Sequence, residues 1–299
     1  LAGNPYAGTT SYNFTTAAAP DTTPPVVQIT DSAAGTATGT IIYNLQFSEA
    51  VTGLASNDFS VGNGSVLGIS GSGNSYSVSV APAADFEGNL SFSLLAGAIT
   101  DAAGNPNALT QAALQAVDTR APTAQTFSPA DEAGAVAIGS DITVTFSEDI
   151  QRGSGTIVLR TGAGAIVASY DAAGSANLSL SGNTLTINPS ADLAYASSYK
   201  VEFAPGSIRD LAGNPYAGTT SYNFTTAAAP RSLTGTLAAD ILIGAEGGDT
   251  LTALAGNDIL VGLAGNDSLD GGSGLDTAVY GGIRAGYTVS RSASDWLVA

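Results

Sequence analysis

Five aspartates stand at a constant spacing of nine residues toward the C-terminal end of the sequence: Asp240, Asp249, Asp258, Asp267 and Asp276. A glycine stands two residues before each of the last four: Gly247, Gly256, Gly265 and Gly274. An apolar residue follows each aspartate two residues later, a leucine in the first four cases and Ala278 in the fifth. A period shared by carboxylates, glycines and apolar side chains indicates a repeated unit that gathers oxygen ligands.

Each nine-residue unit divides into a glycine-permitted turn and a short strand with one apolar side chain directed inward. If two units make one coil, aspartates eighteen residues apart lie on the same side of neighbouring coils. Each such pair then offers carboxylates to one ion, and the carbonyls of the glycine turns complete an oxygen shell that suits Ca²⁺ better than Mg²⁺. The pairs are Asp240/Asp258, Asp249/Asp267 and Asp258/Asp276.

The stretch Asp270–Asp276 reads DGGSGLD, a near-complete copy of the pattern G-G-x-G-x-D-x-apolar-x. It resembles the calcium-binding (hemolysin-type) nonapeptide repeat of repeats-in-toxin (RTX) proteins. We therefore expect a short parallel β-roll over residues 231–280, followed by a truncated capping hairpin over residues 281–299. Ala253 and Leu254 replace glycines of the pattern, so distorted turns and weaker sites are expected there.

Composition excludes most catalytic chemistry. The sequence has no Cys and no His, which removes disulfides, thiolate nucleophiles, imidazole bases and the usual zinc sites. It carries 25 Asp and Glu against 8 Lys and Arg, so nucleic acid and anionic lipid are not expected partners, whereas a divalent cation is. No apolar run approaches the roughly 18 residues of a membrane helix. The start, without Met or a signal peptide, indicates a fragment or a processed piece.

An identical stretch occurs twice: residues 1–20 recur unchanged at 211–230, an offset of 211 − 1 = 210 residues. This repeat indicates a longer parent built from tandem units. Residues 1–20 are then the closing strand of a preceding domain. Since Tyr12 and Phe14 have no such domain to pack against, we expect the segment to be disordered or to pair with a neighbouring molecule.

The region between these copies divides into two similar halves, with predicted domains over residues 21–118 and 119–230. Both halves contain a Phe-Ser-Glu motif and a D-x-A-G-N-P turn, and a Pro-rich joint of the form D-T-x-x-P precedes each. The motifs lie at Phe47–Glu49 and Phe146–Glu148, and the turns lie at Asp101–Pro106 and Asp210–Pro215.

Both halves are predicted to be β-sandwiches. Alternating apolar and polar residues predict strands at Ile41–Phe47, Ser75–Val80, Asp141–Phe146 and Ser198–Phe203. About seven short strands in roughly 100 residues are typical of an Ig-like sandwich. On the motifs above, residues 21–230 resemble bacterial Ig-like domains of large surface proteins. The predicted fold class is all-β, with two tandem Ig-like β-sandwiches followed by a short parallel β-roll.

Five further acidic residues lie near the predicted domain ends: Glu49, Asp101, Asp118, Glu148 and Asp210. They have two open interpretations. Asp and Asn commonly cap turns by bonding their own backbone. The resemblance implies instead calcium sites at the joints, next to linkers that carry Asp21 or Asp118. Asn105 and Asn214 are expected to hold their turns.

The resemblance to RTX adhesins implies a calcium-binding stalk segment of a bacterial protein that is exported by type I secretion to the cell surface and serves adhesion or a biofilm matrix. The expected partners are calcium, other copies of the chain, or a cell or matrix surface, with no membrane insertion and no enzymatic activity. Two alternatives remain open: a self-assembling S-layer or filament protein, and the accessory region of a secreted hydrolase. A sugar platform at Trp296 is less expected, because a lone Trp beside strands is more often core or cap.

Overall fold

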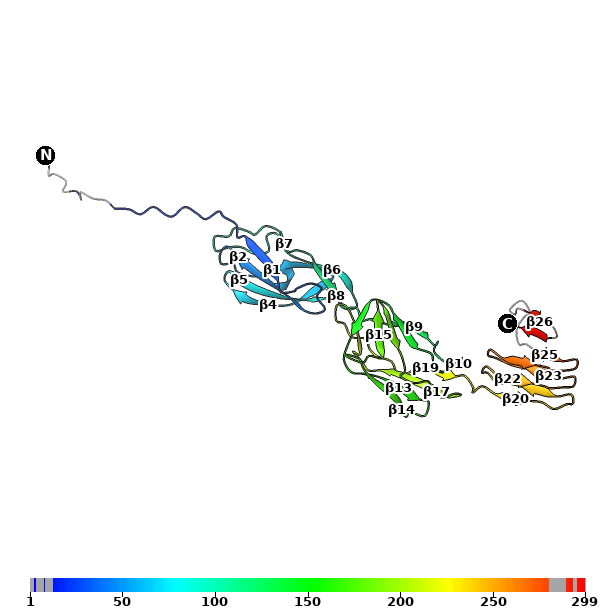
Figure 1. Cartoon of the computed structure of the whole chain (residues 1–299). Helices are drawn as coiled ribbons and strands as arrows, with labels where there is room; N and C mark the ends of the chain where they lie inside the picture. The colour runs from blue at the N-terminus through cyan, green and yellow to red at the C-terminus, as the bar shows by residue number, and fades with distance from the viewer. Residues whose placement is uncertain (1–2, 4–7, 9–12, 280–288, 293–294, 299) are drawn as a thin grey trace. The chain divides into compact units, whose positions relative to one another are not determined.

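The computed structural model describes residues 3, 8, 13–279, 289–292 and 295–298. Two compact units, Leu1–Arg120 and Ala121–Ala299, make up the chain. Among the described residues, regular secondary structure consists almost entirely of strands, as Figure 1 shows, and the all-β prediction is confirmed. Their one helical turn is the 3₁₀ segment η1 (Ser56–Asp58), and they include no helix that could cross a bilayer.

Unit 1 is a sandwich of two sheets. The first has the antiparallel order β1-β2-β5-β4, with bounds Val27–Asp31, Ile41–Phe47, Ser75–Pro82 and Gly64–Ser72. In the second, β6 (Glu87–Leu94) pairs with β3 (Phe59–Gly62), β7 (Thr110–Gln111) and β8 (Gln115–Asp118). Strand β2 has the predicted bounds, and β5 extends two residues beyond its predicted end.

The core of unit 1 consists of the strand residues that face inward, which alternate with exposed or partly buried residues along each strand. Every second residue of β2 is buried, and so are Leu90, Phe92 and Leu94 of β6. The Phe92 ring connects the two sheets, because its centroid lies 4.1 Å from that of Tyr43 and 5.0 Å from that of Phe59. Among the described residues, this apolar core contains no carboxylate.

Unit 2 begins with a second sandwich. One sheet has the order β10-β19-β17-β13-β14, with bounds Ala133–Val136, Asn223–Thr226, Ser198–Phe203, Thr156–Thr161 and Ile166–Asp171. The other has the order β15-β16-β11-β9, with bounds Leu178–Ser181, Thr184–Ile187, Ile142–Phe146 and Ala124–Ser128. Strands β12 (Ile150–Arg152) and β18 (Ile208–Asp210) form a separate pair. The predicted strands at 141–146 and 198–203 are confirmed by β11 and β17.

The C-terminal part of unit 2 is the predicted β-roll. One parallel sheet contains β20 (Ser232–Thr234), β22 (Thr250–Thr252) and β24 (Ser268–Asp270), and the other contains β21 (Ile241–Ile243), β23 (Ile259–Val261) and β25 (Thr277–Val279). The strands pair with an offset of eighteen residues, as in Leu233↔Leu251↔Leu269. Beyond the roll, β26 (Val289–Ser292) pairs antiparallel with β27 (Asp295–Val298).

Where the sequence departs from the repeat, the turns of the roll keep the backbone conformation of the turn that follows the pattern. Leu254 and Leu263 stand at a glycine position of the pattern, and each has a φ of 73°, the value found at the equivalent Gly272. The leucines therefore adopt the left-handed conformation, which costs a residue with a Cβ roughly 1–2 kcal/mol. The departures produce local strain rather than the distorted turns expected from the sequence.

Two buried tyrosines give a matched test of the sandwich cores. Burial raises the pKa of Tyr43 to about 12 and that of Tyr222 further above its usual range. The Tyr222 hydroxyl donates to the carbonyl of Pro129 at 2.8 Å, whereas that of Tyr43 has no partner among the described residues. Because an unsatisfied buried hydroxyl is unfavourable, we expect Tyr43→Phe to leave the unfolding free energy of unit 1 unchanged or up to about 1 kcal/mol higher.

Tyr222→Phe should instead destabilise unit 2 by about 1 kcal/mol, because it removes the hydrogen bond from the buried hydroxyl to the carbonyl of Pro129. Calorimetry of the whole chain measures both transitions. Equal losses in the two variants would contradict the assignment of an unpartnered hydroxyl at Tyr43.

Candidate metal centres

The aspartates of the β-roll bond to the backbone of the neighbouring coil. Oδ1 of Asp258 accepts a hydrogen bond from the N–H of Asp240 at 2.7 Å. In the same way, Asp267 accepts from Asp249 at 2.8 Å, and Asp276 accepts from Asp258 at 3.0 Å. Aspartates that are eighteen residues apart in the sequence therefore lie on neighbouring coils, and the carboxylate of one bonds to the backbone of the other.

Two of these carboxylates are buried. Asp249 and Asp258 are each 1% exposed, and Oδ2 of Asp258 has no hydrogen-bond partner among the described residues. By contrast, Oδ1 of Asp249 accepts from the N–H of Arg231, and its Oδ2 accepts from the N–H of Ala245. A buried carboxylate oxygen without a donor is unfavourable unless a cation or a proton accompanies it. The Asp258 oxygen therefore fits a hard cation such as Ca²⁺.

A Cβ on any of the four predicted glycines would meet the backbone of an earlier turn or of the segment before the roll. A Cβ on Gly256 would lie 2.6 Å from the carbonyl carbon of Ala238, and one on Gly265 would lie 2.5 Å from the carbonyl oxygen of Gly247. Gly247 and Gly274 face similar obstruction, from the carbonyls of Ala228 and Gly256. Steric packing thus accounts for glycine at these positions.

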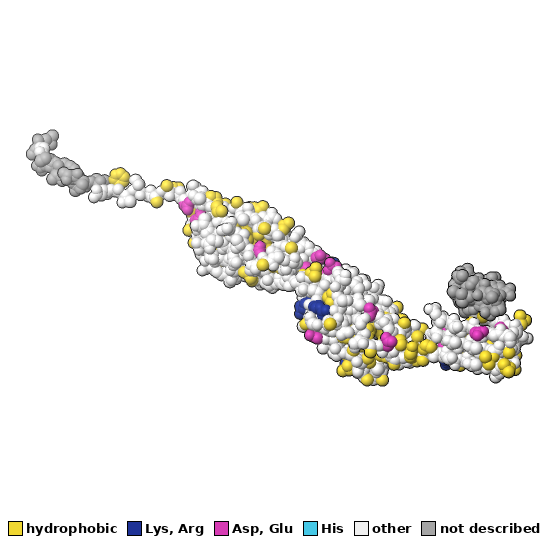
Figure 2. All heavy atoms as spheres, viewed as in Figure 1, with side chains coloured by type: hydrophobic (Ala, Val, Ile, Leu, Met, Phe, Trp, Pro, Cys, Tyr) yellow, Lys and Arg dark blue, Asp and Glu magenta, His cyan; other side chains and the backbone are white. Residues whose placement is uncertain are grey.

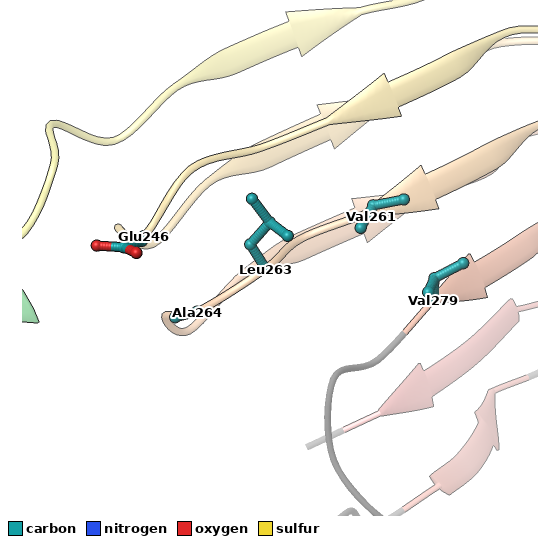
Figure 3. A pocket seen from close by; sticks show the side chains of 5 residues that line it. All are labelled: Glu246, Val261, Leu263, Ala264 and Val279. Carbon is teal, nitrogen blue, oxygen red and sulfur yellow. The ribbon is translucent and has the colours of Figure 1, made fainter.

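A groove of about 460 Å³ also lies on the roll, lined by Glu246, Val261, Leu263, Ala264 and Val279. Figure 3 shows Val261 and Val279 on the adjacent strands β23 and β25, with Glu246 at the opposite end of the groove. Four of the five lining residues are apolar, and only Glu246 offers carboxylate oxygens. The groove therefore lacks the oxygen-rich lining of a calcium site.

Unit 1 contains a cluster of three carboxylates that lie far apart in the sequence. Asp21, Glu49 and Asp101 each contribute one carboxylate oxygen, and these oxygens all lie within 4.8 Å of one another. Asp21 belongs to the segment before β1, Glu49 follows β2, and Asp101 begins the D-x-A-G-N-P turn. Two oxygens on one calcium ion lie up to about 5 Å apart, since each Ca–O bond is about 2.3–2.6 Å. The cluster is therefore compact enough for one ion.

Asn105 organises this cluster. Its backbone N–H and its Nδ2 donate to the two oxygens of Asp101, both at 2.8 Å, and Nδ2 also donates to the carbonyl of Asp21 at 3.2 Å. Oδ1 of Asp21 in turn accepts from the N–H of Thr23 at 2.9 Å. The amide thus ties the Pro-rich segment to the turn, the holding role expected for Asn105.

Like charges meet in this cluster. Burial raises the pKa of Glu49, and the negative charges of Asp101 and Asp21 nearby raise it further. The Asn105 hydrogen bond lowers the pKa of Asp101 despite its burial. In the part of the chain that the structure describes, no salt bridge neutralises the three carboxylates. Figure 2 likewise shows more acidic than basic side chains on the face in view.

Unit 2 repeats the arrangement. One carboxylate oxygen of Glu148 and one of Asp210 lie within 4.8 Å of each other. Asp210 is 1% exposed, and its oxygens accept from the N–H of Asn214 and from its Nδ2, both at 2.7 Å. Asn214 therefore holds Asp210 as Asn105 holds Asp101, and the internal repeat extends to individual hydrogen bonds.

Asp118 and Asp21 share a local geometry. Asp118 is the last residue of β8 and is 8% exposed, and its Oδ1 accepts from the N–H of Arg120 at 3.0 Å. This bond matches the one from Thr23 to Asp21, two residues along each D-T-x-x-P segment. The candidate ligands predicted from the sequence include Asp118 but not Asp21. The shared motif was the signal that could have identified Asp21.

Three stretches of the chain match models of known families. Residues 21–117 and residues 118–226 match two different models that are both described as a bacterial Ig-like domain. Residues 243–278 match the RTX calcium-binding nonapeptide repeat in four copies. No curated protein matches the chain.

Solved structures share only coarse similarity with the chain. CopC from Methylosinus trichosporium OB3b is 20% identical, over 35% of this chain and 92% of that one, with a TM-score of 0.27. The Yersinia pseudotuberculosis adhesin InvE is 13% identical over 67% and 58%, with a TM-score of 0.25. The ectodomain of mouse nectin-like molecule 4 is 15% identical over 68% and 61%, with a TM-score of 0.21.

The repeats, the two sandwiches, the roll register and the family matches agree with one another. The chain consists of two bacterial Ig-like domains followed by calcium-binding RTX nonapeptide repeats, which is the domain composition of an RTX-type repeat adhesin.

Proposed function

We propose that this chain is a calcium-binding extracellular segment of a bacterial adhesin or stalk, in which Ig-like modules extend the molecule and the RTX repeats fold on calcium binding after secretion. The stacked aspartates of the roll, with the unpartnered Asp258 oxygen, carry this proposal. The role is structural and non-enzymatic, in adhesion at the cell surface or in a biofilm matrix.

Folding of the roll depends on neutralising its carboxylates. Among the described residues, its buried apolar cluster consists of Leu251, Ala253 and Leu260, with a few partly buried leucines around them, and this is little apolar surface to oppose charge repulsion. At low cytosolic calcium the roll stays unfolded and suitable for export. At millimolar calcium, a site with a Kd of about 10⁻⁴ M adds about 1.4 kcal/mol, so three sites can decide folding.

We propose that each calcium site of the roll is formed by the carboxylates of two aspartates eighteen residues apart. Carbonyl oxygens of the glycine turns supply the remaining ligands. The ligands are Asp240, Asp249, Asp258, Asp267 and Asp276 with the turn glycines Gly247, Gly256, Gly265 and Gly274. Because Asp258 belongs to two pairs and is buried, we expect it to contribute most.

The acidic clusters are proposed to be calcium sites that stiffen the joints. The first consists of Asp21, Glu49 and Asp101. By the internal repeat, the second includes Glu148 and Asp210, which lie within the second Ig-like family match. Asp118 stands in the second D-T-x-x-P segment where Asp21 stands in the first, and we propose it as a further calcium ligand. Because Asp21 belongs to a Pro-rich linker, an ion bound at the first site would restrict that linker as well as neutralise the charges.

Neutralising Asp258 tests the roll sites. We expect Asp258→Asn to raise the calcium concentration at the folding midpoint of the roll at least tenfold, because the variant weakens two pairs. Asp240→Asn is the matched control, since Asp240 belongs to one pair and is less buried, and it should cause a smaller shift. Circular dichroism of the whole chain during calcium titration measures both midpoints. Equal shifts would contradict the paired arrangement.

Neutralising Glu49 tests the unit 1 cluster. A carboxyl whose pKa is raised by folding favours the folded state below its unfolded pKa, and this contribution is lost as pH rises through its folded pKa. At neutral pH the Glu49 charge therefore opposes folding of the metal-free domain. We expect Glu49→Gln to unfold at an equal or higher temperature in chelator and to lose the increase that calcium gives the parent chain.

Asp85→Asn is the control for this cluster, because the Asp85 side chain is 85% exposed and belongs to unit 1. It should retain the full calcium-dependent increase. If Glu49→Gln retains that increase as well, Glu49 is not a calcium ligand.

A further inference from the structure

Strand β19 has an exact copy elsewhere in the chain. Its sequence Asn223–Thr226 recurs at Asn13–Thr16, within the repeat of residues 1–20 at 211–230. The first copy is irregular and exposed along residues 13–20. Phe14 is 77% exposed, whereas its twin Phe224 is 1% exposed. Tyr12, the twin of Tyr222, lies outside the described residues. The same four residues are therefore buried in one place and uncovered in the other.

β19 occupies an interior position of its sheet. It pairs in parallel with β10 on one side and antiparallel with β17 on the other. Phe224 lies opposite Tyr199 on β17, and the ring centroids are 5.8 Å apart. Without β19, both neighbouring strands would present unpaired backbone groups at edges that accept another strand.

The side chains of β19 complete this fit. Thr226 Oγ1 donates to the carbonyl of Ala194 at 2.6 Å and accepts from the N–H of Ser197 at 3.0 Å. Thr225 Oγ1 lies 3.1 Å from Oγ of Ser198. Asn13–Thr16 carry every atom that makes these contacts, so the segment matches the place of β19 without any change of side chain.

We propose that residues 13–16 can complete the second Ig-like domain of another copy of this chain, in the place of β19, when that copy's own strand is displaced or disabled. The resident strand has the advantage of being tethered, which corresponds to a local concentration of the order of millimolar. Exchange therefore stays rare in the intact chain. The ten residues 17–26 can span roughly 33 Å, which lets the donor's first unit stay folded outside the acceptor.

Disabling the resident strand tests the proposal on the whole chain. Phe224→Asp introduces a charge into the β19 site but leaves Phe14 intact. We expect this variant to associate, with a mass of at least twice the 29.4 kDa of one chain by light scattering, and to keep a folded second domain by calorimetry. The double variant Phe14→Asp/Phe224→Asp has no intact copy, so it should remain monomeric with that domain unfolded. Phe14→Asp alone should be monomeric and folded.

An engineered disulfide identifies the occupant. Lys200 lies directly opposite Asn223, whose twin is Asn13, and the chain has no cysteine of its own. Directly opposed residues in antiparallel strands are about 4.5–5.5 Å apart at Cα, within disulfide range. Asn13→Cys with Lys200→Cys, added to Phe224→Asp, should give disulfide-linked dimers or larger species. Asn223→Cys with Lys200→Cys, in an otherwise unchanged chain, should close within one chain.

Three results would overturn the proposal. The Phe224→Asp variant could be monomeric with its second domain unfolded, like the double variant. It could be a folded monomer in which no disulfide forms between positions 13 and 200. The disulfide could also form only within single chains, which would exclude a second copy as the acceptor.

Discussion

The fold of this protein brings carboxylates close together, with too few basic residues to neutralise them. The β-roll stacks aspartates eighteen residues apart, and the first sandwich brings Asp21, Glu49 and Asp101 within 4.8 Å of one another. With 25 acidic and 8 basic residues, the chain cannot balance these charges internally. Calcium binding therefore couples the charge pattern to the fold.

The two kinds of module respond differently to this constraint. The sandwiches bury large aromatic cores, such as Phe92 stacked between Tyr43 and Phe59, and their acidic clusters lie outside these cores. The roll buries far less apolar surface and includes two carboxylates, Asp249 and Asp258, among its buried residues. Under the proposed function, a sandwich therefore folds without metal and gains stiffness from it, whereas the roll needs metal to fold.

Periodicity was sufficient to predict four of the sandwich strands and the register of the roll. The alternation in Ile41–Phe47 identified β2, and the nine-residue repeat gave the eighteen-residue register of the roll. Features that depend on tertiary approach were beyond this reasoning. The contribution of Asp21 depends on Asn105 reaching its carbonyl, and the left-handed Leu254 depends on the stacking of successive turns. The unpartnered oxygen of Asp258 likewise appears only when its neighbours are in place.

Hydrogen exchange of the whole chain, compared in millimolar calcium and in chelator, tests the central claim most directly. Amide protection reports local opening strand by strand, so it separates the roll from the sandwiches in one experiment. We expect strands β20 to β25 to be protected in calcium and to exchange freely in chelator, while β2, β6, β11 and β17 stay protected in both. Equal protection of β20 to β25 in the two conditions would contradict this expectation.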